Sequence, residues 1–131
     1  MTSAPALGAP GTPVIITGGA SGIGLASAEA LAAVGRGVAL WDINGEAAKS
    51  AADNLAQTYG VAAVGVPVDL RDPDAIAPAL AATRAAVGKP GGLVHAAGTV
   101  DTGSIDGLTV ESWDAGMAIH LRSLALIAQA V

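Results

Sequence analysis

The chain has 131 residues, which fits one domain, and 52% of them are hydrophobic, far above the range of disordered chains. Its net charge of -5 argues against a nucleic-acid partner, because proteins that bind nucleic acids usually carry a basic patch. Its lack of cysteine excludes disulfide bonds and thiolate metal sites, and the spacing of its other residues does not match a metal-ligand motif. None of its apolar runs approaches the roughly 18 residues that a membrane-spanning helix needs.

The first segment, MTSAPALGAPGT, has neither the basic start nor the long apolar run of a secretory signal. Its proline and glycine residues predict a flexible tail over residues 1–12. We expect one domain over residues 13–131 and, because the chain has no cysteine, a cytoplasmic location.

The next part of the chain alternates short apolar runs with longer amphipathic ones. The apolar runs predict strands over 14–17, 38–41 and 61–68, although Pro67 predicts incomplete pairing of the third. The amphipathic runs predict helices over 21–34 and 44–59. Asn44 is the expected N-cap of the second helix, and Gly60 follows its end.

Further along, a helix is predicted over 72–87, where Asp72 is the expected cap and Pro73 occupies the first turn. Pro78 inside this helix predicts either a kink or a later start. A fourth strand is predicted over 93–95 and a long helix over 109–131. Apolar spacing on this last helix predicts an inward stripe of Trp113, Met117, His120, Leu124, Ile127 and Val131.

The alternation of strands and helices indicates an α/β fold. Because the apolar strands do not alternate with polar residues, they predict a parallel sheet covered on both faces. Right-handed crossovers then give a doubly wound, Rossmann-type sheet of about four strands. We expect Trp41 and Trp113 to pack in the core or at its edge.

The motif TGGASGIG, residues 17–24, joins the first predicted strand to the first predicted helix. Gly18 suits a tight turn, Gly22 lets a pyrophosphate approach the backbone, and Gly24 lets the helix pack close to the strand. The hydroxyl of Ser21 adds a donor at a helix N-terminus that attracts phosphate. The alternative is a purely structural turn.

Asp42 lies 18 residues after Gly24, at the end of the second predicted strand, where a carboxylate can accept both hydroxyls of an adenosine ribose. A 2′-phosphate would be repelled by this carboxylate. Neither the residues beside Asp42 nor Ser21 before Gly22 supplies the Arg or Lys that would bind such a phosphate. The sequence therefore predicts NAD over NADP.

Several motifs together resemble the short-chain dehydrogenase/reductase family. Besides TGGASGIG, they are WD at 41–42, VDL at 68–70, HAAG at 95–98 and WDAGMAIHL at 113–121. The resemblance implies that Asp69 reaches the adenine ring and that HAAG lies along the cofactor. The expected cofactor-binding residues are Gly18, Ser21, Gly22, Ile23, Gly24, Asp42, Ile43, Asp69, Leu70, Ala96, Ala97 and Gly98.

The chain also departs from the family pattern. His95 and Ala96 stand where the family has two asparagines, and His120 stands where it has an asparagine that holds a water in a proton relay. His120 is either a hydrogen-bonded core histidine or a relay group near the nicotinamide, because neutral imidazole both donates and accepts. We expect His95 to be a packing residue at the end of its strand.

The family's catalytic Ser and Tyr-x-x-x-Lys have no counterpart here, since the single tyrosine, Tyr59, has no lysine four residues later. The resemblance thus implies the N-terminal half of an NAD-dependent oxidoreductase that acts on a small alcohol or ketone. The alternative is an NAD-binding module without catalysis. The resemblance also implies a homo-oligomer formed through the helix over 109–131.

Overall fold

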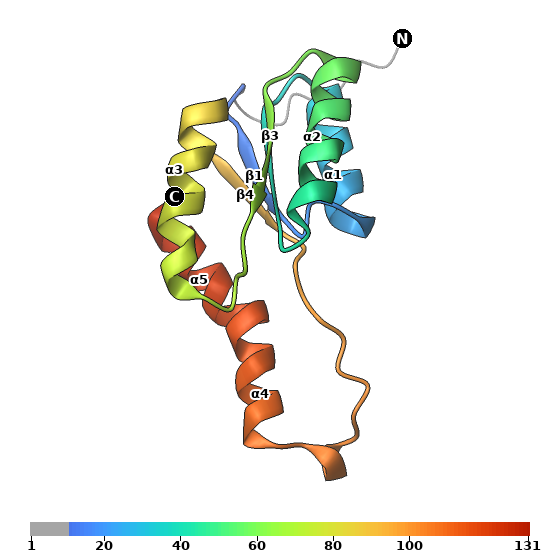
Figure 1. Ribbon diagram of the computed structural model, residues 1–131, viewed down its shortest axis with the longest axis vertical. Coiled ribbons are helices and arrows are strands. Elements are labelled where there is room, and N and C mark those ends of the chain that lie inside the picture. The colour runs from blue at the N-terminus through green and yellow to red at the C-terminus, as the bar shows by residue number, and fades with distance from the viewer. Residues whose placement is uncertain (1–10) are drawn as a thin grey trace.

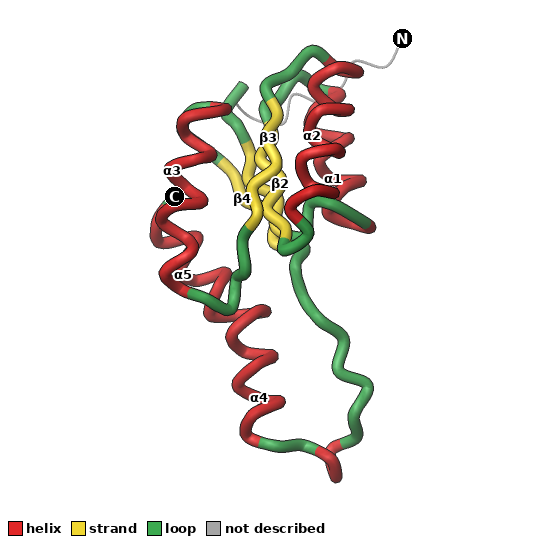
Figure 2. The backbone as a smooth tube through the Cα atoms, viewed as in Figure 1, coloured by secondary structure: helices red, strands yellow, loops and turns green. Residues whose placement is uncertain are grey.

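The computed structural model describes residues 11–131 and has a parallel sheet at its centre (Figures 1 and 2). The strands are β1 (Val14–Thr17), β2 (Val38–Asp42), β3 (Ala63–Pro67) and β4 (Gly92–His95), in the order β3-β2-β1-β4. This architecture confirms the predicted Rossmann-type fold. Residues 1–10 of the predicted tail lie outside the described residues.

The strand register brings the carboxyl ends of the strands to one edge of the sheet. Thr17 of β1 lies opposite Trp41 of β2 and His95 of β4, and Asp42 lies opposite Pro67 of β3. Residues that follow these strands therefore meet at the same edge, where ligands bind in open α/β sheets. Pro67 ends β3, so this strand is shorter than the predicted 61–68.

Helices cover both faces of the sheet (Figure 2). On one face, α1 (Gly22–Ala33) and α2 (Gly45–Tyr59) pack through small residues, which keeps this layer thin. On the other face lie α3 (Ile76–Val87) and α5 (Ser123–Ala130). Because apolar residues of the strands face both layers, the strands read as continuous hydrophobic runs.

Trp41 is the largest fully buried side chain, as expected of a core residue. Its indole N–H donates to the Thr83 hydroxyl at 2.8 Å, and that hydroxyl donates to the Ala79 carbonyl at 2.9 Å. The only polar atom of the indole is thus satisfied inside the core, as burial requires.

The predicted helix over 72–87 begins later than its first residue. A 3-10 turn over Pro73–Ala75 comes first, and the Asp72 carboxylate accepts the Asp74 N–H at 3.0 Å. Pro78 then lies in the first turn of α3, where a missing N–H costs no helical hydrogen bond. The later start, one of the two alternatives, is confirmed.

The predicted helix over 109–131 is interrupted. It consists of α4 (Val110–Met117), a π-helical segment (Ala118–Arg122) and α5. Thr109 caps α4, accepting the Ser112 N–H at 3.1 Å. A π-helical insertion changes which residues share a helix face. The side chains before and after residues 118–122 therefore do not form one continuous stripe.

The prediction that the stripe faces inward is wrong for its first half, from Trp113 to His120. Trp113 is 57% exposed, and Met117 and His120 are also exposed, whereas Ile127 is fully buried. In Figure 1, α4 extends beyond the ends of the strands, so the sheet does not cover it. The expectation that Trp113 packs in the core or at its edge is wrong for the same reason.

Among residues 11–131, none of the helices has the length and hydropathy needed to cross a membrane.

Candidate functional site

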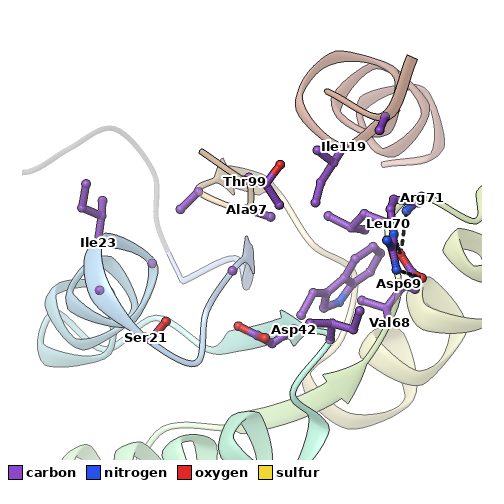
Figure 3. Close-up of a pocket in the computed structure, with 18 residues that line it drawn as sticks. Ser21, Ile23, Asp42, Val68, Asp69, Leu70, Arg71, Ala97, Thr99 and Ile119 are labelled. Atoms are coloured by element: carbon purple, nitrogen blue, oxygen red, sulfur yellow. Dashed lines mark hydrogen bonds and ion pairs between the residues drawn. The ribbon is translucent and has the colours of Figure 1, made fainter. Parts of the chain in front are cut away.

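A pocket of about 550 Å³ lies at the carboxyl ends of the strands (Figure 3). Its walls come from the turn before α1, from the ends of β2, β3 and β4, and from the helix that begins at Val110. The structure brings together in it every residue expected to bind cofactor: Gly18, Ser21, Gly22, Ile23, Gly24, Asp42, Ile43, Asp69, Leu70, Ala96, Ala97 and Gly98.

The N-terminus of α1 opens into this pocket. Ser21 is its N-cap residue, but the Ser21 side chain makes no capping hydrogen bond within the described chain, and the first turn contains no acidic residue. Gly22 has a φ of 54°, and a Cβ built on it would meet nothing within 4 Å. The N–H groups at a helix N-terminus favour a negative charge, so this open space suits a phosphate or pyrophosphate.

Gly24 serves packing instead. A Cβ at this position would collide with the carbonyl oxygen of Gly18. Only glycine therefore allows α1 to begin so close to the turn that follows β1.

Asp42 is held in a fixed orientation at the end of β2. One carboxylate oxygen accepts the Ala20 N–H at 3.0 Å, and the other accepts the Asn44 N–H at 2.9 Å. Each oxygen keeps a further lone pair. The half-buried carboxylate can thus accept hydrogen bonds from two neighbouring hydroxyl groups in the pocket.

Two isoleucines give this polar region apolar walls. Ile23 is 82% exposed and Ile43 is 67% exposed, yet both line the pocket. Large apolar side chains exposed around a concave site commonly mark a surface that a ligand covers.

In the loop after β3, Asp69 is paired with Arg71. The guanidinium donates to the two carboxylate oxygens at 3.0 and 2.9 Å, and the Arg71 backbone N–H donates to one of them at 3.0 Å. The side-chain hydrogen bond from Arg71 lowers the pKa of Asp69, and the same bond raises the pKa of Arg71. Both groups are therefore charged near neutral pH.

Arg71 is a residue that the sequence reasoning missed. Among the described residues that line the pocket, it is the single cation, and its charge is matched by Asp69. The Asp-x-Arg spacing in VDLRD was the available signal. The other lining residues not predicted are Trp41, Val68, Thr99, Ala115 and Ile119.

The end of β4 is tied to β1 through Thr17, which is fully buried. Its hydroxyl accepts the Ala97 N–H at 3.2 Å and lies 2.8 Å from Nδ1 of His95. Nε2 of His95 is buried without a hydrogen-bond partner among residues 11–131. The contact with Thr17 supports a packing role for His95, which does not line the pocket.

His120 lies just outside the pocket and contacts the segment after β4. Its Nε2 is 2.9 Å from the Thr99 carbonyl oxygen and 3.3 Å from the Thr99 nitrogen. The ring packs so closely on Gly98 that a Cβ there would collide with it. Because His120 is exposed, the core-histidine interpretation is wrong. Its role in a relay stays a prediction.

Within residues 11–131, no group of three or more His, Asp or Glu side chains is placed to hold a metal ion. The arrangement instead combines an anion site, a carboxylate fixed beside it and apolar walls. This combination can hold a ligand that carries phosphate, vicinal hydroxyls and a flat ring system.

Comparison with known protein families and sequences gives consistent matches. A family model described as enoyl-(acyl carrier protein) reductase matches residues 18–131. The chain is 36% identical to a protein named probable galactose dehydrogenase from Rhizobium meliloti, over 90% of this chain and 46% of that protein. It is also 36% identical to D-threitol dehydrogenase from Mycolicibacterium smegmatis, over 92% of this chain and 46% of that protein.

Solved structures share the fold. L-sorbose reductase from Gluconobacter frateurii, complexed with NADPH and L-sorbose, matches with a TM-score of 0.88 and 29% identity, over 95% of this chain and 48% of that one. A short-chain dehydrogenase from Burkholderia cenocepacia in complex with NADP matches with a TM-score of 0.84 and 33% identity, over 92% of this chain and 49% of that one. The chain thus spans about half the length of these relatives.

Proposed function

Because the chain belongs to the short-chain dehydrogenase/reductase family, whose members bind a nicotinamide cofactor, we propose that it forms the NAD-binding part of an oxidoreductase. The observation that carries this proposal is the uncapped N-terminus of α1, which opens into the pocket beside the fixed carboxylate of Asp42. When bound, the nicotinamide supplies the hydride chemistry. The chain's own residues bind and orient it.

The strand order supports one orientation of the dinucleotide. The pyrophosphate site lies at α1, after the central strand β1. Asp42 at the end of β2 suits the adenosine ribose, and Asp69 and Leu70 after β3 lie one strand further out, on the adenine side. The segment Ala96–Gly98 after β4 lies on the opposite side of β1 and suits the nicotinamide half.

We propose a preference for NAD over NADP. The two solved structures compared above contain NADPH and NADP, so the preference rests on this chain's own charges. Asp42 would repel a 2′-phosphate, and Arg71, the cation among the described lining residues, is already bound by Asp69. The pocket therefore presents no free cation from its described lining to that phosphate.

Asp42→Arg tests this preference. Replacing the carboxylate by a cation should shift the ratio of NADPH to NADH affinity toward NADPH by about tenfold or more, or about 1.4 kcal/mol. Asp42→Asn, which removes the charge but keeps the size, should give a smaller shift. Dissociation constants for both cofactors measure the effect. An unchanged ratio in both variants would contradict the proposed role of Asp42.

The proposed substrate is a small alcohol or ketone. The relatives named for galactose, D-threitol and L-sorbose support a hydroxylated substrate of this kind.

We propose His120 as the relay position because it joins the helix to Thr99 beside the nicotinamide half of the pocket. Exposed Trp113 and Leu121 support a homo-oligomer formed through the helix region 109–131. A cytoplasmic location stays a prediction.

A non-catalytic NAD-binding module is the second candidate. The single tyrosine of the chain, Tyr59, lies at the end of α2, is 42% exposed and does not line the pocket. The position four residues later is Ala63 rather than lysine. The chain therefore has no tyrosine and lysine pair that faces the proposed cofactor. This favours a module that binds NAD but does not transfer a proton through such a pair.

The deciding experiment is a titration of the 131-residue chain with NADH while tryptophan emission is recorded. Buried Trp41 lines the pocket and should lose emission by energy transfer to bound NADH. A Trp113→Phe variant isolates this signal, because Trp113 lies on exposed α4. Saturable binding that is weaker for NADPH is expected. A folded chain, checked by circular dichroism, that does not bind millimolar NADH would contradict the proposal.

Hydride transfer separates the two candidates. When this chain is assayed within the whole protein of which it is the proposed NAD-binding part, an oxidoreductase should change NADH absorbance with some member of a panel of polyols, sugars and their ketones. A non-catalytic binding module should not. Binding without turnover across that panel would favour the second candidate.

A further inference from the structure

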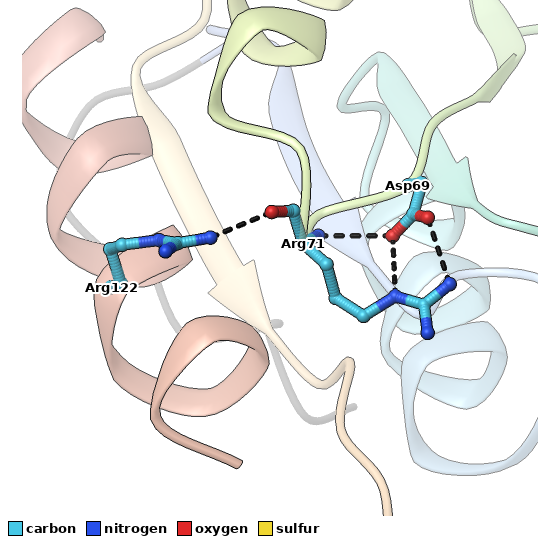
Figure 4. A network of polar contacts seen from close by, with 3 residues as sticks. All are labelled: Asp69, Arg71 and Arg122. Carbon is cyan, nitrogen blue, oxygen red and sulfur yellow. Dashed lines mark hydrogen bonds and ion pairs between the residues drawn. The ribbon is translucent and has the colours of Figure 1, made fainter. Parts of the chain in front are cut away.

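A hydrogen bond joins the last residue of the π-helical segment to the loop after β3. The guanidinium Nη2 of Arg122 donates to the backbone carbonyl of Arg71 at 2.6 Å, across 51 positions of sequence (Figure 4). Arg71 in turn binds both oxygens of Asp69. One polar chain thus runs from the helix, through Arg71, to a carboxylate that lines the pocket.

The loop that Arg122 contacts forms one wall of the pocket. The Val68 N–H donates to the Asp42 carbonyl at 3.0 Å, and the Asp72 N–H donates to the Asp69 carbonyl at 3.1 Å. These bonds fix the start of the loop on β2 and close a turn at its end. The bond from Arg122 fastens the Arg71 carbonyl to the π-helical segment, whose Ile119 also lines the pocket.

The π-helical segment makes contacts in two directions. His120 and Arg122 are two residues apart, a spacing at which side chains on a helix do not face the same way. His120 reaches the Thr99 carbonyl after β4, and Arg122 reaches the Arg71 carbonyl after β3. Ile119, the residue before His120 in the same segment, lines the pocket (Figure 3). Such π-helical turns recur at functional sites.

We propose that Arg122 is a positioning residue that holds the loop Val68–Arg71 in place to receive the adenine end of the cofactor. This inference rests on the proposed function, because it needs a dinucleotide in the pocket. Arg122 does not line the pocket and acts through Arg71. Loss of the Arg122 side chain should therefore weaken binding of the adenine half of the ligand and leave binding of the nicotinamide half unchanged.

The contact suits this role better than a packing role. Arg122 is exposed, so its removal leaves no cavity in the core. The bond is charge-assisted, and such bonds are stronger than neutral ones, although exposure to water reduces the effect. We expect a loss of about fivefold in affinity for the adenine half rather than unfolding.

Two half-ligands test the proposal by calorimetry. ADP-ribose carries the adenine half, and reduced nicotinamide mononucleotide carries the other half. Arg122→Gln should lower the affinity for ADP-ribose by about fivefold and leave the affinity for the mononucleotide within about twofold of the parent chain's value. Arg122→Lys keeps a cationic donor and should recover part of the loss. Arg84→Gln, on α3 and away from this pocket, is the matched control and should change neither.

The outcomes separate this inference from the proposed function. Parent chain that binds ADP-ribose, together with an Arg122→Gln variant that binds it equally well, would overturn the role of Arg122 while the proposed function stands. Equal weakening of both half-ligands would also overturn it, because that result indicates a general structural effect. A folded parent chain that binds neither half-ligand contradicts the proposed function, and the inference with it.

Discussion

The N-termini of α1 and α2 are built for different purposes, although each helix follows a strand of the same sheet and packs on the same face. At α2, the Asn44 side chain accepts the Ala47 N–H at 3.1 Å, and Glu46 lies in the first turn. At α1, the Ser21 side chain makes no such bond within the described chain, and the first turn has no acid.

This difference separates stability from binding. A side-chain cap is worth about 1 kcal/mol, and an acidic residue in the first turn adds a few tenths. Helix α2 has both stabilising features, whereas α1 has neither. The N–H groups of α1 are consequently available to an anion in the pocket. The helix with the less stabilised N-terminus is thus the one suited to a ligand.

The largest effect on stability and NADH affinity is expected from Gly24→Ala, which displaces the start of α1. The new Cβ would collide with the Gly18 carbonyl, so the helix must move away from the turn. We expect a loss of about 2 kcal/mol or more in unfolding free energy and at least about tenfold in NADH affinity. Urea unfolding and NADH titration measure these effects.

Gly116→Ala is the matched control for this change. Gly116 lies inside α4, and a Cβ there would meet nothing within 4 Å. It should leave NADH binding unchanged and stabilise the chain by up to about 1 kcal/mol. If Gly24→Ala behaved like Gly116→Ala, the close approach of α1 would not matter for the site.

A smaller effect is expected from Ser21→Asp, which makes α1 resemble α2. An aspartate at this position supplies both a cap and a negative charge where the pyrophosphate is proposed to bind. The variant should gain up to about 1 kcal/mol in stability and lose about tenfold in NADH affinity. Ser21→Asn adds the cap without the charge and should lose less affinity. Equal NADH affinity in both variants and the parent chain would count against an anion site here.

The smallest effect is expected from Asn44→Ala, which removes the cap from α2. The unfolding free energy should fall by about 1 kcal/mol because the Ala47 N–H loses its partner. NADH affinity should not change, since Asn44 does not line the pocket and its backbone N–H to Asp42 remains. Asn44→Asp keeps a capping oxygen and should retain stability. A severalfold change in NADH affinity would show that α2 also takes part in binding.

Local sequence was sufficient for the first half of the site. The turn between β1 and α1 spans a few residues, and its glycines are required by contacts with near neighbours, such as Gly24 with Gly18. Asp42 ends β2 and Asp69 follows β3, and these two strands are parallel neighbours, so both carboxylates lie at the same edge of the sheet. For this reason the expected binding residues all line one pocket.

The long C-terminal helix shows where such reasoning fails. Apolar spacing predicted one inward stripe through Trp113 and Ile127, but the π-helical segment lies between them. Periodicity reports which residues share a face only while the helix remains regular. It could not show that α4 extends past the sheet, nor that Ile119 reaches the pocket.

The sequence by itself determined the parallel sheet, the glycine turn and the carboxylates at the strand ends, because each depends on short-range conformational preference and on the two-sided burial of the strands. Tertiary structure alone decided the exposed side chain of His120 and the bond from Arg122 to the Arg71 carbonyl. These features depend on where elements distant in sequence meet. Side-chain spacing within one element carries no information about such meetings.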